Sequence, residues 1–84
     1  MDEIYLNGKF VSRSSAQISI MDRGFLFGDG VYELIPVYNK KIFLLHKHLN
    51  RLKNSLSLIG MSDISGLEDI IKQLISRNST ENFF

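Results

Sequence analysis

The hydrophobic pattern of this chain changes its period once, near Leu45, and the change divides the chain into two parts. Before Leu45, short runs of strand-forming residues alternate with turn pairs, as in Ile4-Tyr5-Leu6 followed by Asn7-Gly8. After Leu45, leucine and isoleucine recur every three or four residues, the spacing of one face of a helix. Strands followed by helices predict an α+β fold, with a small antiparallel sheet and two helices packed on one of its faces.

The first thirty residues predict a hairpin, a strand and a loop. Asn7-Gly8 is the pair that best accepts positive φ at both central positions of a type I′ turn, so residues 1–15 predict a hairpin. Residues 16–20 alternate apolar and polar side chains and predict a short half-buried strand. Residues 22–30 hold three glycines among Phe25, Leu26 and Phe27, which predicts a folded loop that packs its aromatic side chains.

A second hairpin is predicted around the turn pair Asn39-Lys40. Residues 31–37 are rich in strand formers and residues 42–45 are apolar, so each predicts one strand of this hairpin. Pro36 lacks an N–H and therefore predicts a bend or an edge position near the end of the longer strand.

Two helices are predicted after Leu45. The first has a stripe of apolar residues and ends at Gly60, which accepts the left-handed conformation. The stripe consists of Leu45, Leu49, Leu52, Leu56 and Ile59. The second begins after Ser65-Gly66-Leu67-Glu68, which has the spacing of a capping box, and ends near Asn78. Its apolar residues are Leu67, Ile70, Ile71, Leu74 and Ile75.

Composition excludes several classes of protein. A chain of 84 residues with 44% hydrophobic residues supports one domain with one modest core. The formal charge is +1 and the basic residues are scattered, which argues against nucleic acid as a partner. There is no cysteine, so neither a disulfide framework nor a thiolate metal site can form. The longest apolar run has four residues, 42–45, and Met1-Asp2-Glu3 does not resemble a signal peptide, so we expect a cytoplasmic protein without a membrane partner.

Few residues in the sequence indicate a binding or catalytic site. The glycines follow the order G-x-x-x-G-x-G ahead of a predicted strand, which differs from a dinucleotide fingerprint, and no P-loop occurs. His48 and Arg51 are three residues apart, so a helix places both on one side, where the planar fork of Arg51 suits a phosphate or carboxylate. The spacing alone favours an ordinary surface arginine over one that binds a ligand. His46 and His48 diverge on a helix, and we expect no metal site. Tyr32 follows the glycine loop and fits either a half-buried strand residue or a carboxylate ligand.

An ordered set of segments resembles one known family. They read DRGFLFGDGVYE at 22–33, PVYN at 36–39 and HLNRL at 48–52, preceded by YLNGKF at 5–10. Together they resemble the amino-terminal domain of class IV pyridoxal-phosphate-dependent aminotransferases, most closely those that act on D-amino acids. The resemblance covers about the first sixty residues, whereas residues 61–84 agree only in their helical pattern.

The resemblance implies roles for individual residues. Arg51 corresponds to the arginine that binds the cofactor phosphate, and Tyr32 to a tyrosine that helps to hold the α-carboxylate of the substrate. His48 is expected to support the packing, and Glu33 to serve the fold or a subunit interface. The Schiff-base lysine belongs to a larger carboxy-terminal domain that these 84 residues do not include. None of the six lysines matches it, so we expect no catalytic residue in this chain. They are Lys9, Lys40, Lys41, Lys47, Lys53 and Lys72.

The resemblance therefore implies that residues 1–84 are the small amino-terminal domain of a homodimeric enzyme. Such an enzyme transfers an amino group between a D-amino acid and a 2-oxo acid, and the isolated domain is expected to be inactive. Fragments of a branched-chain aminotransferase or an aminodeoxychorismate lyase are alternatives, as is a non-catalytic module that self-associates. Phe83-Phe84 resembles the start of another strand, so we expect the chain to be cut from a longer one.

Overall fold

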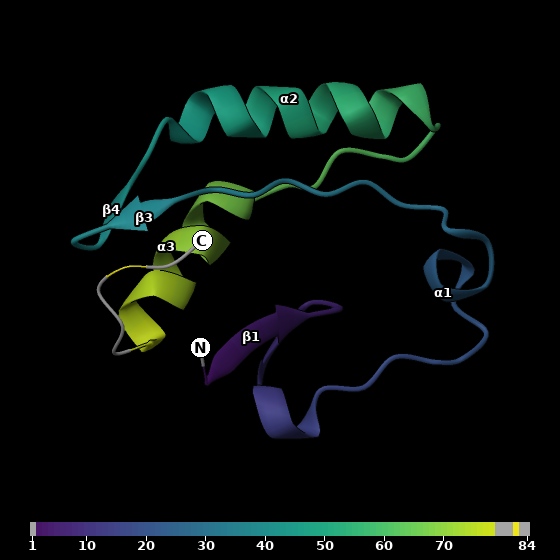
Figure 1. Ribbon diagram of the computed structural model, residues 1–84, viewed down its shortest axis with the longest axis horizontal. Helices are drawn as coiled ribbons and strands as arrows, with labels where there is room; N and C mark the ends of the chain where they lie inside the picture. The colour runs from purple at the N-terminus through teal and green to yellow at the C-terminus, as the bar shows by residue number, and fades with distance from the viewer. Residues whose placement is uncertain (1, 79–81, 83–84) are drawn as a thin grey trace.

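The computed structural model describes residues 2–78 and 82, and these residues adopt an α+β fold. Within them the strands form two separate two-stranded antiparallel sheets (Figure 1). In chain order the elements are β1 (Glu3–Leu6), β2 (Lys9–Ser12), a 3-10 helix (Arg13–Ser15), α1 (Arg23–Phe27), β3 (Val37–Tyr38), β4 (Lys41–Ile42), α2 (Leu45–Leu58) and α3 (Leu67–Arg77). The α+β class predicted from the sequence is confirmed, although the two hairpins are not joined into one sheet.

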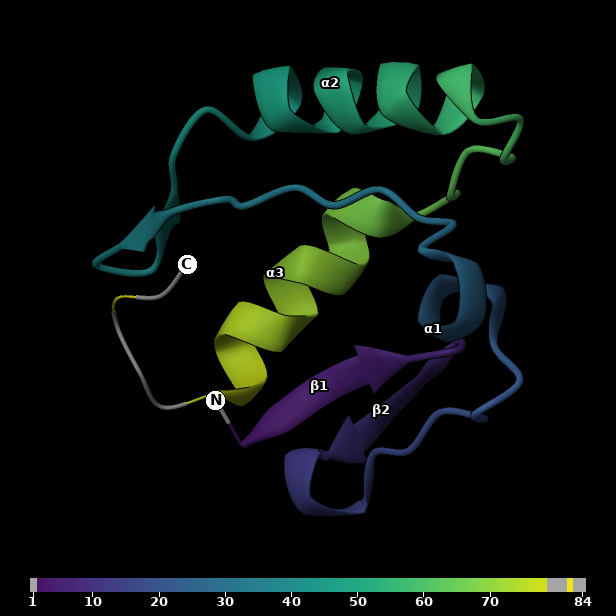
Figure 2. The ribbon, with the colours of Figure 1, turned by 45° about the vertical axis from the view of Figure 1, so that its right-hand side comes forward.

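The first hairpin is confirmed in its position and its turn. Asn7 and Gly8 have φ values of 50° and 86°, the positive values that a type I′ turn requires. Tyr5 lies opposite Phe10 in the register, and their rings make an edge-to-face contact with centroids 5.0 Å apart. The helix α3 packs beside β1, as Figure 2 shows.

Asn78 joins the end of α3 to the first strand. Its side-chain oxygen accepts hydrogen bonds from the backbone N–H groups of Asp2 and Glu3, at 2.9 and 3.1 Å. Its amide nitrogen donates to the carbonyl oxygens of Glu3 and Leu74, at 3.1 and 2.7 Å. The residue is 4% exposed, and the predicted end of the helix near Asn78 is confirmed.

The strand predicted at residues 16–20 is wrong. Among the described residues these five form no ladder with another strand, and Ile18 and Ile20 are 57% and 74% exposed. A strand needs a neighbour for its backbone hydrogen bonds, and neither described sheet includes this stretch. Alternation of side chains alone could not supply that neighbour.

The glycine-rich stretch forms the short helix α1 rather than a loop that packs its aromatics. Asp22 caps the helix by accepting from the N–H of Gly24 at 2.8 Å, and Gly28, with φ of 70°, ends it. Phe25 and Phe27 are 68% and 66% exposed, so the predicted aromatic packing is wrong for this chain. The other described elements leave most of both side chains uncovered.

The second hairpin is shorter than predicted. Asn39 and Lys40 form its turn with φ values of 50° and 61°, but each strand has only two residues, and residues 31–36 belong to neither strand. After Ile42 only one further backbone bond joins the two sides, from the N–H of Phe43 to the Pro36 carbonyl at 2.9 Å. The returning strand ends because Leu44 adopts a φ of 53° and α2 begins at Leu45.

The helix α2 matches its prediction. Gly60 has a φ of 75°, its N–H bonds to the Ser57 carbonyl, and the N–H of Met61 bonds to the Leu56 carbonyl, which is a Schellman ending. The apolar stripe is buried at Leu45 and Leu56 but 47% exposed at Ile59.

The helix α3 is confirmed, but its predicted capping box does not form. Gly66, with φ of 70°, occupies the cap position and no side chain caps the helix, because Ser65 lies one residue too early. Ile75 of this helix joins the buried residues Val37, Leu45 and Leu56 in the small core. Phe83 and Phe84 lie outside the described residues. Within residues 2–78, no helix is long and apolar enough to cross a membrane.

Candidate functional site

Glu33 brings together two side chains that project from α2. The extended residues 31–36 run beside this helix in both ribbon views (Figures 1 and 2). One Glu33 oxygen, Oε1, lies 2.7 Å from Nδ1 of His48, and the other, Oε2, accepts from Nε of Arg51 at 3.0 Å. The Nη2 group of Arg51 also donates to Oε1. His48 and Arg51 therefore share one side of the helix, as their three-residue spacing predicts.

The cluster has a buried negative centre and an exposed positive end. The side chains of Glu33 and His48 are 6% and 15% exposed, whereas that of Arg51 is 68% exposed. Hydrogen bonds from Arg51, and next from His48, lower the pKa of Glu33 from its usual 4.5 to about 2. The Glu33 carboxylate in turn raises the pKa of Arg51. Both groups are therefore charged near neutral pH.

Arg51 retains hydrogen-bond donors for a further ligand. A guanidinium carries five N–H donors, and Glu33 engages those on the Nε and Nη2 side. In the part of the chain that the structure describes, the Nη1 group has no hydrogen-bond partner. Its two donors and the exposed position of the side chain suit a phosphate or carboxylate.

Tyr32 and Arg51 line the same shallow cavity. The cavity has a volume of about 410 Å³ and is lined by Tyr32, Glu33, Leu34, Arg51 and Ser55. Tyr32 is 86% exposed, so its hydroxyl can reach a ligand in this cavity. The structure thus brings the two residues singled out in the sequence to one place, while their binding roles stay predictions.

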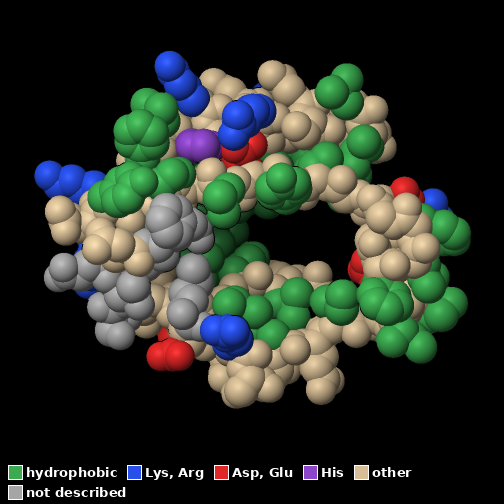
Figure 3. Space-filling view, in the orientation of Figure 1, with side chains coloured by type: hydrophobic (Ala, Val, Ile, Leu, Met, Phe, Trp, Pro, Cys, Tyr) green, Lys and Arg blue, Asp and Glu red, His purple; other side chains and the backbone are tan. Residues whose placement is uncertain are grey.

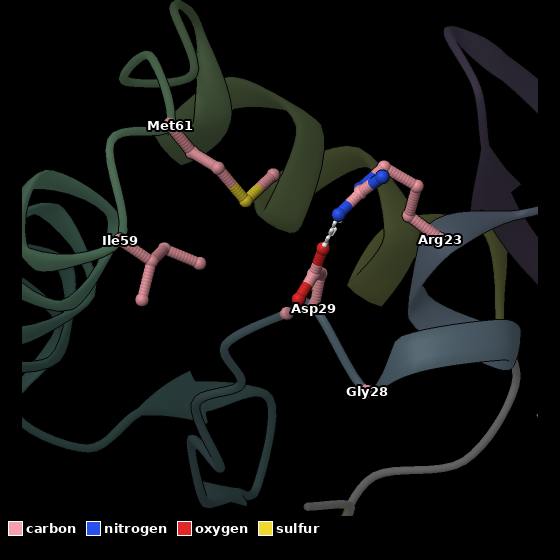
Figure 4. A pocket seen from close by; sticks show the side chains of 6 residues that line it. Arg23, Gly28, Asp29, Ile59 and Met61 are labelled. Carbon is pink, nitrogen blue, oxygen red and sulfur yellow. Dashed lines mark hydrogen bonds and ion pairs between the residues drawn. The ribbon is translucent and has the colours of Figure 1, made fainter.

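A second cavity, of about 500 Å³, lies between α1 and the end of α2 (Figure 4). On one side Arg23 and Asp29 form an ion pair of 2.7 Å, and Ile59 and Met61 face them from the other side. Arg23 and Asp29 are the charged residues in the described lining of this cavity, and they pair with each other. The space-filling view has an opening beside α1, with apolar side chains around its rim (Figure 3).

The central place of Glu33 does not follow from the sequence, which assigns this residue to the fold or to a subunit interface. One signal could have identified it, because a helix carrying His48 and Arg51 offers two groups that bind a carboxylate. That signal does not say that residues 31–36 lie against α2, which only the tertiary structure establishes.

Comparison with known proteins defines the class of this chain. The sequence model of the amino-transferase class IV family matches residues 30–83, which include Tyr32, Glu33, His48 and Arg51. The chain belongs to the class IV aminotransferase family.

Particular relatives extend this result. The chain is 43% identical over 84 residues to the D-alanine aminotransferase of Staphylococcus aureus (strain N315), covering 96% of this chain and 30% of that protein. It is 35% identical over 85 residues to the D-alanine aminotransferase of Staphylococcus epidermidis (strain ATCC 12228), covering 98% of this chain and 30% of that protein. A Methanocaldococcus jannaschii protein, provisionally named a branched-chain-amino-acid aminotransferase, is 49% identical over 53 residues, which are 63% of this chain and 18% of that protein. The chain thus spans about 30% of the length of the first two relatives.

Proposed function

We propose that this chain is the amino-terminal domain of a pyridoxal-phosphate-dependent D-amino-acid aminotransferase. The whole protein would transfer an amino group between a D-amino acid and a 2-oxo acid. Membership of class IV and the similarity to D-alanine aminotransferases over 96% of the chain support this proposal. The observation that carries it is that Arg51 and Tyr32 line one cavity, while the Nη1 group of Arg51 has no hydrogen-bond partner among the described residues.

The residues of this chain fit the phosphate end of the cofactor. Arg51 would hold phosphate oxygens through its Nη1 edge, and its charge persists at any working pH. The Tyr32 hydroxyl would donate a hydrogen bond to the α-carboxylate of the amino acid in the same cavity. When bound, the cofactor supplies the group that carries the amino nitrogen between the two substrates.

The remaining chemistry would come from the rest of the whole protein. Among the described residues, those that line the Tyr32–Arg51 cavity include no lysine that could bond the cofactor covalently. We therefore expect the 84-residue chain to be inactive alone. We also propose that the whole protein is a cytoplasmic homodimer, in which its remaining residues cover the apolar side chains exposed between residues 16 and 36.

A second candidate is a branched-chain L-amino-acid aminotransferase. It is favoured by the 49% identity over 53 residues to the Methanocaldococcus jannaschii relative, although that match covers less of the chain. The exposed apolar side chains favour a third candidate, a non-catalytic module that associates with itself.

The test is an amino-transfer assay on the whole protein, with the chain continued to the length of its relatives and loaded with pyridoxal phosphate. The amino donor is D-alanine in one reaction and L-leucine in another, with 2-oxoglutarate as acceptor in both. Faster transfer from D-alanine supports the proposal. Transfer from L-leucine alone would replace it with the branched-chain candidate, and no transfer with any donor would favour the non-catalytic module.

A variant pair connects the assay to the site. Arg51→Ala should weaken pyridoxal phosphate binding by about 1.5–3 kcal/mol, because a charge-assisted hydrogen bond is lost. Arg77→Ala is the matched control, since Arg77 also pairs with a glutamate, Glu3, at 3.0 Å but lies on α3. Unchanged cofactor affinity in Arg51→Ala would remove Arg51 from the site.

A further inference from the structure

The Glu33 carboxylate is nearly inaccessible, although its main partner is exposed. Its side chain is 6% exposed, against 68% for Arg51. A buried carboxylate is costly unless it is paired and hydrogen-bonded, and both of its partners, His48 and Arg51, project from α2. Glu33 therefore attaches the extended residues 31–36 to this helix through one charged cluster.

The contacts fix the orientation of the Arg51 guanidinium. Glu33 engages it through Nε and through Nη2, so the planar group is held at two points rather than one. A free arginine loses much rotamer freedom when it binds an anion. An arginine already held by Glu33 has lost that freedom on folding, so less remains to be lost on binding.

Glu33 could instead weaken phosphate binding by Arg51, because a negative charge beside an anion site repels the anion. The position of the carboxylate argues that orientation outweighs this repulsion. The carboxylate lies on the Nε side of the guanidinium and is almost fully covered, whereas the Nη1 edge faces away from it. In addition, Oε1 of Glu33 already has a second partner, because Nδ1 of His48 lies 2.7 Å from it.

We propose that Glu33 is a positioning residue for the cofactor phosphate, acting by fixing Arg51 with its Nη1 edge open to the phosphate oxygens. The proposal rests on the proposed function, since it takes Arg51 as the phosphate ligand. Glu33 itself touches neither cofactor nor substrate. Its effect is carried entirely by the orientation of one guanidinium.

The test compares two ligands of the whole protein that differ only in the phosphate. Dissociation constants are measured for pyridoxal phosphate and for pyridoxal, and their ratio reports the phosphate contact alone. Glu33→Gln should reduce the preference for the phosphorylated ligand by about tenfold, the lower end of the loss seen when a residue that orients a metal-binding side chain is removed. A purely structural role would weaken both ligands equally and leave the ratio unchanged.

Glu68→Gln is the matched control. Glu68 also lies near a histidine of α2, with 3.6 Å between its Oε1 and Nε2 of His46, but it makes no contact with the Arg51 cluster among the described residues. The control variant should keep the parent preference for pyridoxal phosphate. If it lowers the preference as much as Glu33→Gln does, the effect is not specific to the Arg51 cluster and the proposal is overturned.

Arg51→Ala, alone and combined with Glu33→Gln, separates this proposal from the proposed function. If Glu33 acts through Arg51, adding Glu33→Gln to Arg51→Ala changes the ratio no further. An unchanged ratio in Arg51→Ala itself would reject the assigned phosphate ligand. A reduced ratio in Arg51→Ala, with an unchanged or increased ratio in Glu33→Gln, would retain that ligand and reject the positioning role.

Glu33→Asp keeps the test decisive if Glu33→Gln does not fold. Aspartate retains the negative charge but is shorter by one methylene, so it cannot hold Nε and Nη2 at the same place. The positioning role predicts a reduced ratio in Glu33→Asp as well. A parent-like ratio in this variant would mean that charge, rather than orientation, is the contribution of Glu33, and would overturn the proposal.

Discussion

The β1–β2 hairpin with α3 and the segment of residues 16–30 differ in how far they bury their apolar side chains. In the first, Asn78 satisfies backbone groups of β1, and Arg77 lies 3.9 Å over the ring of Phe10. In the second, Ile20 and Phe25 remain 74% and 68% exposed. The contrast teaches that one part of this chain contains its own packing partners, whereas the other is organised mainly by short-range bonds, such as the Asp22 cap of α1.

The largest expected effect on stability is the difference between truncating one isoleucine in each region. Ile75 of α3 is 7% exposed and Ile20 of the segment is 74% exposed. Ile75→Ala should lower the free energy of unfolding of this chain by about 3 kcal/mol, because a buried side chain is replaced by a cavity. Ile20→Ala should change it by less than about 0.5 kcal/mol. Urea unfolding measures the free energy of unfolding of both variants. Equal losses would contradict the difference in burial between the two regions.

The second effect concerns the link between α3 and β1. Asn78→Ala should lower the free energy of unfolding by about 2 kcal/mol, because the backbone N–H groups of Asp2 and Glu3 lose their acceptor. Asn54→Ala, at an exposed position of α2, is the control and should have little effect. A loss in Asn78→Ala no larger than in the control would mean that the hairpin and helix hold together without this residue.

The third effect compares the two turns. Gly8 and Lys40 occupy equivalent turn positions with φ values of 86° and 61°. Gly8→Ala should cost about 1 kcal/mol because a Cβ is strained at that φ, and Lys40→Gly should gain about 0.5 kcal/mol by removing such strain. The two changes are read from unfolding midpoints. A destabilised Lys40→Gly would show that side-chain contacts of Lys40 outweigh its backbone strain.

The last effect is the pH dependence that Glu33 contributes. Its pKa is about 2 in the folded protein and 4.5 ordinarily, so the unfolded chain takes up the proton first as the pH falls. The stabilisation is complete above pH 4.5 and is lost as the pH falls toward 2. Unfolding midpoints at about pH 6 and about pH 3 should therefore differ less in Glu33→Gln than in the parent. Equal differences would mean that Glu33 is not held by the cluster.

The features predicted correctly are those that local chemistry decides. The Asn7-Gly8 turn and the end of α2 at Gly60 follow from which residues accept positive φ, and both occur. The apolar stripe of α2 also appears, because helical spacing is a property of neighbouring residues. The strand at residues 16–20 depended on a partner that the local sequence cannot specify, and it does not form.

The candidate site also has features that local spacing predicts and features that depend on distant contacts. The three-residue spacing of His48 and Arg51 on a helix predicts their common side, and family resemblance singled out Arg51 and Tyr32. The role of Glu33 could not be predicted from spacing, because its contacts with α2 join residues 15 and 18 positions apart. The exposure of Phe25 and Phe27 could not be predicted either, since their aromatic composition suggests burial whether or not the chain contains the covering surface.

The most direct test of the central claim is a crystal structure of the whole protein with pyridoxal phosphate bound. The account predicts Nη1 of Arg51 within about 3 Å of a phosphate oxygen, with Nε and Nη2 still facing the Glu33 carboxylate. A phosphate held by other groups, with the Arg51 guanidinium directed into solvent, would contradict it.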